Sequence, residues 1–237
     1  MGIVDHPHLL TLLAYSCDGE DLCLLYPFME GGSVEERLAG RYQDRPSLSP
    51  MQRLKIALGS AAGLEYLHNA SHTKPLVHRD VKTANILLDG KCEPKVGDFG
   101  LVRLGDSSAA GLSHRPLTLI TQTVVGTSAY MAPEAVRGEV TVKLDVFSFG
   151  VVLLELLTGL PAMDTDRETV DLVGHMEEAV EEENDLDVYL DKKFSLMEWR
   201  QVSPKQLYKI SQRCLLQKKK ERPMMTEIHR DISSLFH

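Results

Sequence analysis

The sequence has few features of secreted or membrane-spanning proteins. Its four cysteines are scattered, with no close pair at metal-ligand spacing and no disulfide-rich pattern, so we expect reduced thiols and a cytoplasmic location. The longest apolar stretch, residues 146–160, is interrupted by serine, glutamate and threonine and is too short to cross a membrane. Residues 1–5 lack the basic and apolar regions of a signal peptide.

Clustered positive charge is also scarce. The formal net charge is −8, and the one basic run, residues 218–220, ends a helical pattern, where a solvated face is the usual explanation. Nucleic-acid binding depends on clustered lysine and arginine, so nucleic acid is not expected as a main partner. The histidine pairs at 6 and 8 and at 68 and 72 lack a third ligand, and we interpret them as surface or loop histidines rather than a metal site.

What the sequence does contain is enough apolar residues, 43%, for one sizeable core. Two short strands are predicted at residues 9–16 and 22–26, joined by a turn at 17–20. Apolar residues at helical spacing predict a core helix at 51–69, and a segment that is apolar on nearly all sides predicts a central buried helix at 144–158. Further helices are predicted at 167–183, 204–217 and 223–236.

Three short motifs follow one another between residues 78 and 134. They are His-Arg-Asp-Val-Lys-Thr-Ala-Asn at 78–85, Asp-Phe-Gly at 98–100 and Ala-Pro-Glu at 132–134. A three-residue motif alone is weak, because it occurs by chance in many proteins. In this order, they resemble the catalytic loop, the metal-binding motif and the activation segment of the protein kinase family. The resemblance implies an α+β, protein-kinase-like fold with a mainly α-helical C-lobe and a remnant of the N-lobe β-sheet.

Phosphoryl transfer explains why these residue types occur together. Its transition state spreads negative charge over the γ-phosphate oxygens, so a protein must position the reactants and neutralise charge. The resemblance implies that Asp80 accepts the proton of the attacking hydroxyl and that Lys82 lies beside the γ-phosphate. It also implies that Asn85 and Asp98 bind Mg²⁺, so the expected cofactors are ATP and Mg²⁺. The loop has the Lys-Thr-Ala-Asn form, and Thr127 is similar to a family residue that contacts the catalytic side chains. In the resemblance, both features favour protein substrates with Ser or Thr hydroxyls.

Five further residues resemble structural supports of the kinase family. His78 and Phe99 are similar to two members of an apolar stack, which makes His78 a packed scaffold residue rather than a base. Asp145, at the start of the central helix, resembles the buried carboxylate that anchors the catalytic-loop backbone. Glu134 and Arg222 resemble a buried ion pair between the activation segment and the lower lobe.

The adenine site is predicted from the end of the second strand. Tyr26 resembles the kinase gatekeeper, which makes residues 27–30 the hinge. The Pro27 carbonyl and the Met29 N–H would then meet the adenine edge, and proline retains the carbonyl needed there. Leu87 is similar to the residue that packs under the adenine ring.

Two arginines suggest how the activation segment is controlled. Arg79 precedes the catalytic Asp, and Arg103 lies where kinases have a second basic residue, so together they would bind a phosphate on this segment. Thr121 is the first candidate for phosphorylation, Thr118 resembles a second site, and Thr123 lies where many other kinases are phosphorylated.

Longer stretches narrow the resemblance to the Pelle and interleukin-1-receptor-associated kinase group. They lie at residues 22–26, 31–33, 126–134, 148–155, 157–164 and 191–193, and plant receptor-like kinases share much of this pattern. The group implies a cytoplasmic serine/threonine kinase in Toll-like and interleukin-1 receptor signalling. Its receptor–adaptor complex would bind through a domain that this sequence does not contain.

The resemblance covers the whole chain and divides it into three parts. Residues 1–26 correspond to an N-lobe remnant, 27–30 to the hinge and 31–237 to the C-lobe. No Gly-rich phosphate loop, strand lysine or helix C glutamate precedes His6, so we expect this chain alone to be inactive and to expose Leu10, Leu12 and Leu24. Two hypotheses remain open, a piece of an active kinase and a non-catalytic interaction module; the intact catalytic residues favour the first.

Overall fold

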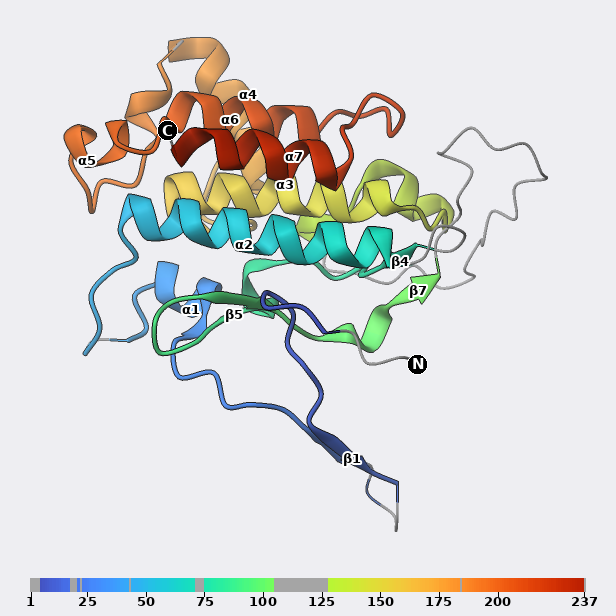
Figure 1. The fold of residues 1–237 in the computed structure, drawn as a ribbon. Helices are drawn as coiled ribbons and strands as arrows, with labels where there is room; N and C mark the ends of the chain where they lie inside the picture. Colours follow the sequence, from blue (N-terminus) through green and yellow to red (C-terminus); the bar gives the residue numbers. More distant parts are fainter. Residues whose placement is uncertain are drawn as a thin grey trace.

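Helices are the main regular elements of the structure, a computed structural model that describes residues 5–17, 21, 23–42, 44–70, 75–104, 128–183 and 185–236. Several long helices lie in layers on one side, short strands lie beneath them, and a hairpin projects from the far end (Figure 1). The expected α+β class with a mainly helical body is therefore confirmed.

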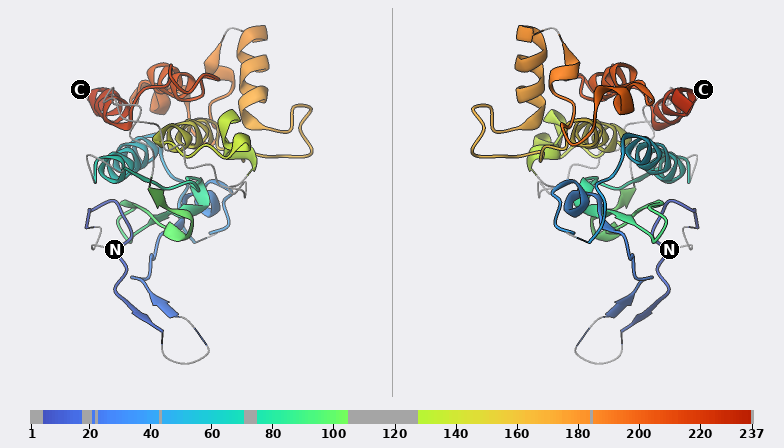
Figure 2. Two further views of the ribbon diagram at one scale, coloured as in Figure 1. Left: turned by 90° about the vertical axis from the view of Figure 1, so that its right-hand side faces the viewer. Right: turned by 90° about the vertical axis from the view of Figure 1, so that its left-hand side faces the viewer.

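The projecting hairpin consists of β1 (Ala14–Ser16) and β2 (Cys23–Leu25), paired antiparallel. Both strands are solvent-exposed along their length, and the hairpin stands apart from the body in both views of Figure 2. The predicted strands at 9–16 and 22–26 are in the right place, but the paired segments are shorter, and residues 18–20 and 22 lie outside the described residues.

Leu10 differs from expectation because it belongs to the body rather than to the hairpin. Its N–H donates to the carbonyl of Val96 at 2.8 Å, and its side chain is only 7% exposed. The sequence prediction that Leu10 is exposed was therefore wrong, since the chain turns inward before β1. Leu12 and Leu24 are exposed, as predicted.

Two small sheets hold the segments that carry the kinase-like motifs. One contains β3 (Gly32–Ser33), β5 (Ile86–Leu88) and β6 (Pro94–Val96) in the order β3-β5-β6, and the other pairs β4 (Leu76–Val77) with β7 (Arg103–Leu104). Ile86 pairs with Val96, so Asn85 and Gly97 are neighbours across the sheet, with the Gly97 N–H donating to the Asn85 carbonyl at 2.8 Å. The register therefore brings the end of the first motif beside the start of the second.

Seven α-helices are described. They are α1 (Val34–Leu38), α2 (Pro50–Asn69), α3 (Val142–Thr158), α4 (Leu172–Glu183), α5 (Leu196–Arg200), α6 (Pro204–Cys214) and α7 (Met225–Ser233). Short 3₁₀ turns include η1 (Thr83–Asn85) and η4 (Ser128–Tyr130). The predicted helices at 51–69 and 144–158 are confirmed as α2 and α3. The short helices α1 and α5 were not predicted, although each begins with a capping box.

The local sequence accounts for the two central helices, α2 and α3. α2 begins with Ser49 as N-cap and a proline in its first turn, and it buries one side along most of its length. In α3 every residue except Lys143 is buried, as expected for a helix through the middle of a domain. A side chain at Gly150 would place its Cβ 2.8 Å from Cys214 Cβ, so this glycine allows α6 to approach α3 closely. No helix in the described ranges is both long and apolar enough to cross a membrane.

The other helix boundaries depend on long-range contacts. α6 ends at Cys214 rather than at residue 217, and the carbonyls of Leu216 and Gln217 accept hydrogen bonds from Arg222 instead. α4 begins at Leu172 rather than at residue 167, because the preceding loop is held by Arg167 through main-chain carbonyls. These partners cannot be inferred from helical periodicity.

Candidate active site

The first motif brings three predicted site residues into contact. The Asp80 carboxylate lies 2.8 Å from Lys82 Nζ through its Oδ2 atom. Asn85 Nδ2 donates to the same Oδ2 at 2.9 Å and to the Asp80 carbonyl at 2.9 Å. Asp80 is buried and Lys82 is partly exposed. The carboxylate is thus held in one orientation beside a cation and an amide, which suits a group that positions a reacting hydroxyl.

The backbone of this motif is held by Asp145 in the first turn of α3. The buried Asp145 carboxylate accepts hydrogen bonds from the N–H groups of His78 and Arg79, both at 2.8 Å. Arg79 has a φ of 73°, a left-handed conformation that costs energy for a residue with a side chain. The two charge-assisted hydrogen bonds offset that strain and set the direction in which the loop continues to Asp80.

A third partner of Asp145 was not foreseen. His68 Nε2 in the last turn of α2 lies 2.8 Å from Asp145 Oδ2, and the histidine is buried. The interpretation of His68 as a surface or loop histidine was therefore wrong. The packing of α2 against α3 brings the end of one helix to the start of the other, a contact that no local pattern reveals.

His78 connects the catalytic loop to the second motif. Its ring lies 5.3 Å from the ring of Phe99, between centroids. Its Nε2 donates to the Gly97 carbonyl at 2.9 Å, and its Nδ1 accepts the Asp80 N–H at 3.3 Å. Burial lowers the pKa of His78, so the ring is neutral near pH 7. Both ring nitrogens are engaged in hydrogen bonds and the ring is fully buried, which suits a scaffold residue rather than a base.

Asp98 and Asn85 offer oxygen atoms suited to Mg²⁺. Asp98 is exposed, and its backbone is left-handed with a φ of 60°. Both side-chain hydrogen bonds of Asn85 are donated by Nδ2, which leaves the amide oxygen as its cation-binding atom. Among the described residues, no group of three or more His, Cys, Asp or Glu side chains could hold a metal ion by itself. A magnesium ion at this pair would need further oxygen ligands, and nucleotide phosphates are such ligands.

The predicted hinge runs beside β5. Met29 is buried, and its carbonyl accepts the Gly32 N–H at 3.1 Å, while Pro27 is partly buried. Ile86 and Leu88 are fully buried, whereas Leu87 is partly exposed because successive strand residues face opposite sides. Leu87 therefore lies on the solvent-accessible face of β5, the strand that pairs with β3.

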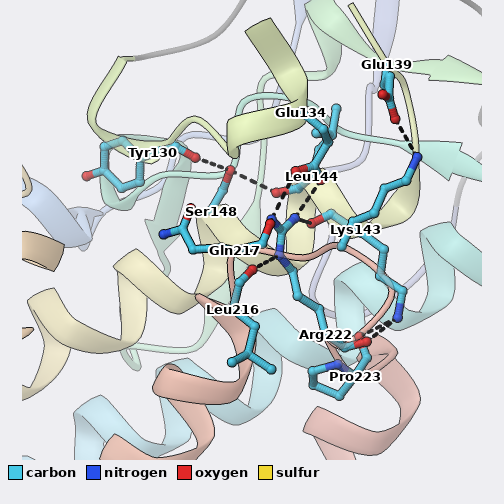
Figure 3. A network of polar contacts seen from close by, with 11 residues as sticks. Tyr130, Glu134, Glu139, Lys143, Leu144, Ser148, Leu216, Gln217, Arg222 and Pro223 are labelled. Atoms are coloured by element: carbon cyan, nitrogen blue, oxygen red, sulfur yellow. Dashed lines mark hydrogen bonds and ion pairs between the residues drawn. The ribbon is translucent and has the colours of Figure 1, made fainter. Parts of the chain in front are cut away.

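The Ala-Pro-Glu motif is held by a buried ion pair (Figure 3). Arg222 binds Glu134 through both nitrogens, at 2.6 and 2.9 Å, and its guanidinium lies 4.9 Å from the centre of the Phe147 ring. It also donates to the main-chain carbonyls of Lys143, Leu216 and Gln217. Five hydrogen bonds and a ring contact satisfy this buried cation, which connects the motif to α3 and to the loop after α6.

The two predicted phosphate-binding arginines are close enough to interact. Arg103 is exposed on β7 and pairs with Val77 of β4, two residues before Arg79. Burial lowers the pKa of Arg79, and the positive charge of Arg103 lowers it further. Like charges in proximity favour the binding of an anion. Thr118, Thr121, Thr123 and Thr127 lie outside the described residues.

Sequence reasoning missed three buried polar residues beneath the loop, namely Thr83, Tyr130 and Glu155. Thr83 and Tyr130 flank recognisable motifs without being distinctive themselves. Glu155 was noticed as an interruption of an apolar run and as part of the stretch 148–155, but no role was assigned to it. A charged residue inside a helix that is apolar on all sides was the signal that could have identified it.

Comparison with known proteins gives a consistent assignment. The family model of the protein kinase domain matches residues 1–232. The Pelle-like serine/threonine-protein kinase pik-1 of Caenorhabditis elegans is 46% identical over 171 residues, 72% of this chain and 34% of that protein. The serine/threonine-protein kinase PBS1 of Arabidopsis thaliana is 44% identical over 167 residues, 70% of this chain and 35% of that protein.

The proline-rich receptor-like protein kinase PERK1 of Arabidopsis thaliana matches more of the chain. It is 38% identical over 233 residues, which cover 96% of this chain and 34% of that protein. The matched segment thus spans about a third of the length of each of these relatives. Because the family model matches nearly the whole chain, the chain belongs to the protein kinase domain family.

Proposed function

We propose that this chain supplies the large lobe and hinge of a serine/threonine protein kinase, which transfers the γ-phosphate of ATP to Ser or Thr hydroxyls of proteins. The observation that carries the proposal is the arrangement of Asp80, Lys82 and Asn85 around one carboxylate oxygen. Residues 1–26 then form part of the N-lobe, 27–30 the hinge and 31–237 the C-lobe.

Each residue of the site has a specific role in this proposal. Asp80 orients the substrate hydroxyl and accepts its proton, and Lys82 contacts the transferring phosphate. Asn85 and Asp98 would hold Mg²⁺, which supplies charge neutralisation at the phosphates when it is bound. Thr127 lies outside the described residues; by resemblance it would contact Asp80 and Lys82 and help to define the Ser/Thr substrate class.

ATP binding is proposed at the hinge. The Pro27 carbonyl accepts a hydrogen bond from the adenine amine, and the Met29 N–H donates to the ring. Leu87 packs under the adenine, consistent with its place on the solvent-accessible face of β5.

Activation is proposed to occur by phosphorylation of the segment between the second and third motifs. A phosphate on Thr121, or on Thr118 or Thr123, would bind between Arg79 and Arg103, whose like charges act on each other. Phosphopeptide mapping of the active full-length protein should find at least one of these threonines modified. Finding all three unmodified would contradict this part of the proposal.

The biological setting is proposed from resemblance. Sequence features similar to those of interleukin-1-receptor-associated kinase 4, and a relative named Pelle-like, favour a cytoplasmic kinase of Toll-like and interleukin-1 receptor signalling that binds a receptor–adaptor complex. A plant-type receptor-like kinase is the second candidate, because PBS1 and PERK1 match at 44% and 38% identity.

The test is the substitution Asp80→Asn in the full-length protein, which keeps the shape of the side chain but removes the carboxylate. We expect phosphate incorporation into a Ser/Thr peptide, with Mg²⁺ and ATP, to fall by on the order of 100-fold or more, with an unchanged melting temperature. Asp166→Asn, at an exposed loop position, is the matched control and should leave turnover unchanged. Turnover by Asp80→Asn equal to that of the control would refute the proposed role.

A further inference from the structure

Three buried side chains form a closed ring of contacts beneath the catalytic loop. Tyr130 Oη lies 2.8 Å from Glu155 Oε2, and Thr83 Oγ1 lies 3.1 Å from Glu155 Oε1. The third side of the ring joins Thr83 Oγ1 and Tyr130 Oη at 3.2 Å. The residues come from η1, η4 and α3, and Glu155 is only 3% exposed.

Counting hydrogens decides which form of Glu155 fits this ring. Three oxygen–oxygen contacts at these distances need three hydrogens, and Thr83 and Tyr130 supply one each. With an ionised Glu155, both hydroxyls donate to the carboxylate, and the contact between them has no hydrogen. A protonated Glu155 donates to one hydroxyl, which donates to the other, which donates back to the acid. Only the neutral acid satisfies all three contacts.

The surroundings of Glu155 also disfavour a negative charge. Burial of a carboxylate without a cation is costly. Among the described residues, the largest charge effect on Glu155 comes from Glu35 of α1, which is itself negative and raises the pKa of Glu155. Hydrogen bonds from Tyr130, Thr83 and the main-chain N–H of Ala162 favour the carboxylate, but burial outweighs them.

We propose that Glu155 is a neutral carboxylic acid that closes the Thr83–Tyr130–Glu155 ring, and that this ring positions the catalytic loop against α3 and the segment before the Ala-Pro-Glu motif. Consistent with this, burial raises the pKa of Glu155 to about 8, and burial also raises the pKa of Tyr130.

The positioning role follows from what each ring member is attached to. Thr83 directly follows Lys82 and begins the turn that ends at Asn85, whose amide holds Asp80. The Tyr130 carbonyl accepts a hydrogen bond from Ser148 of α3 at 2.7 Å (Figure 3). Tyr130 is thus held at both its backbone and its hydroxyl. The positioning role rests on the proposed kinase function, whereas the protonation state of Glu155 does not.

The substitution Glu155→Gln tests the protonation state. The glutamine amide has an N–H donor and a carbonyl acceptor, so it reproduces the three hydrogens of the neutral ring but cannot ionise. For wild-type Glu155, the folded-state pKa of about 8 is higher than the ordinary value of 4.5. Protonated Glu155 therefore makes its full contribution to the free energy of unfolding below about pH 4.5. This contribution decreases as the pH rises toward 8, and above that pH it no longer changes.

The measurement is urea unfolding of the domain in the full-length protein and in Glu155→Gln, at pH 6 and pH 8. We expect the unfolding constant of the wild type, relative to that of the variant, to increase by on the order of 50-fold between these pH values. A ratio that does not change, or that falls with pH, would show that Glu155 is ionised in the folded protein and would overturn the proposal.

Turnover tests the positioning role separately. Tyr130→Phe and Thr83→Val each remove one hydrogen from the ring, and we expect each to lower kcat by on the order of tenfold with little change in the KM for ATP. Glu155→Leu should lower kcat similarly, and Glu155→Gln should recover most of that loss. Unchanged kcat in Tyr130→Phe and Thr83→Val, with active wild-type protein, would refute the positioning role. An inactive wild type would instead refute the kinase assignment, and the unfolding experiment would still decide the protonation state.

Discussion

Replacement of Arg222 by alanine should be among the most destabilising single changes in this domain. The guanidinium is fully buried and satisfies both oxygens of Glu134, which is also buried. Arg222→Ala would leave that carboxylate without its cation and remove one donor from each of three main-chain carbonyls, and it would open a cavity beside Phe147.

The expected magnitude follows from these lost contacts. Removal of one partner of a buried ion pair costs roughly 3–5 kcal/mol, because the remaining charge is stranded. In a domain of this size, each kcal/mol lowers the melting temperature by about 2–4 °C, so the expected decrease is roughly 6–20 °C. Arg213→Ala is the matched control, because Arg213 pairs with Asp231 at the surface and such pairs contribute at most about 1 kcal/mol.

The assay is thermal and urea unfolding of the full-length protein and its variants. Glu134→Gln in the Arg222→Ala background should recover part of the lost stability, because the stranded group is then uncharged. An unchanged melting temperature for Arg222→Ala, or a decrease equal to that of Arg213→Ala, would show that the pair is not the anchor described above.

Three further outcomes are expected. Asp145→Ala should lower the free energy of unfolding by at least about 3 kcal/mol, because the charge-assisted hydrogen bonds to His78 and Arg79 are lost; a urea midpoint equal to that of Asp166→Ala would contradict this. Iodoacetamide should modify the exposed Cys17 and Cys23 before Cys214, whose pKa is raised to about 12 by burial; mass spectrometry that found Cys214 labelled equally fast in the folded protein would argue against the α3–α6 packing. Leu87→Ala should weaken ATP binding by on the order of tenfold through lost apolar contact, and calorimetry that gave an unchanged Kd would place the adenine elsewhere.

Long elements with strong local signals were predictable from the sequence. α2 and α3 combine clear hydrophobic patterns with an N-cap serine in one case and a terminal glycine, Gly159, in the other. The ends of α4 and α6 were predicted less well, because the side chains of Arg167 and Arg222 bind main-chain carbonyls at these ends, and helical periodicity does not reveal such partners. The predicted hairpin strands were longer than the observed ones for a similar reason, because Leu10 forms a hydrogen bond with Val96, which is distant in the sequence.

Sequence reasoning also succeeded for some residues at the candidate site and failed for others. Asp80, Lys82 and Asn85 lie within one short motif, and the structure brings them into direct contact. Their catalytic roles stay predictions until turnover is measured. His68 was assigned to the surface because its partner, Asp145, is 77 positions away in the sequence and is reached only when α2 packs on α3.

The sequence by itself determined the family and predicted the residues of its candidate site, because contiguous motifs encode them and need no partner to be recognised. Only the tertiary structure decided the environment of each ionisable group. Glu155 is an ordinary acidic residue in the sequence, and its proton is retained because folding removes it from water and surrounds it with two hydroxyls rather than a cation. Burial and long-range partners arise from packing, and packing is a property of the whole chain rather than of any segment.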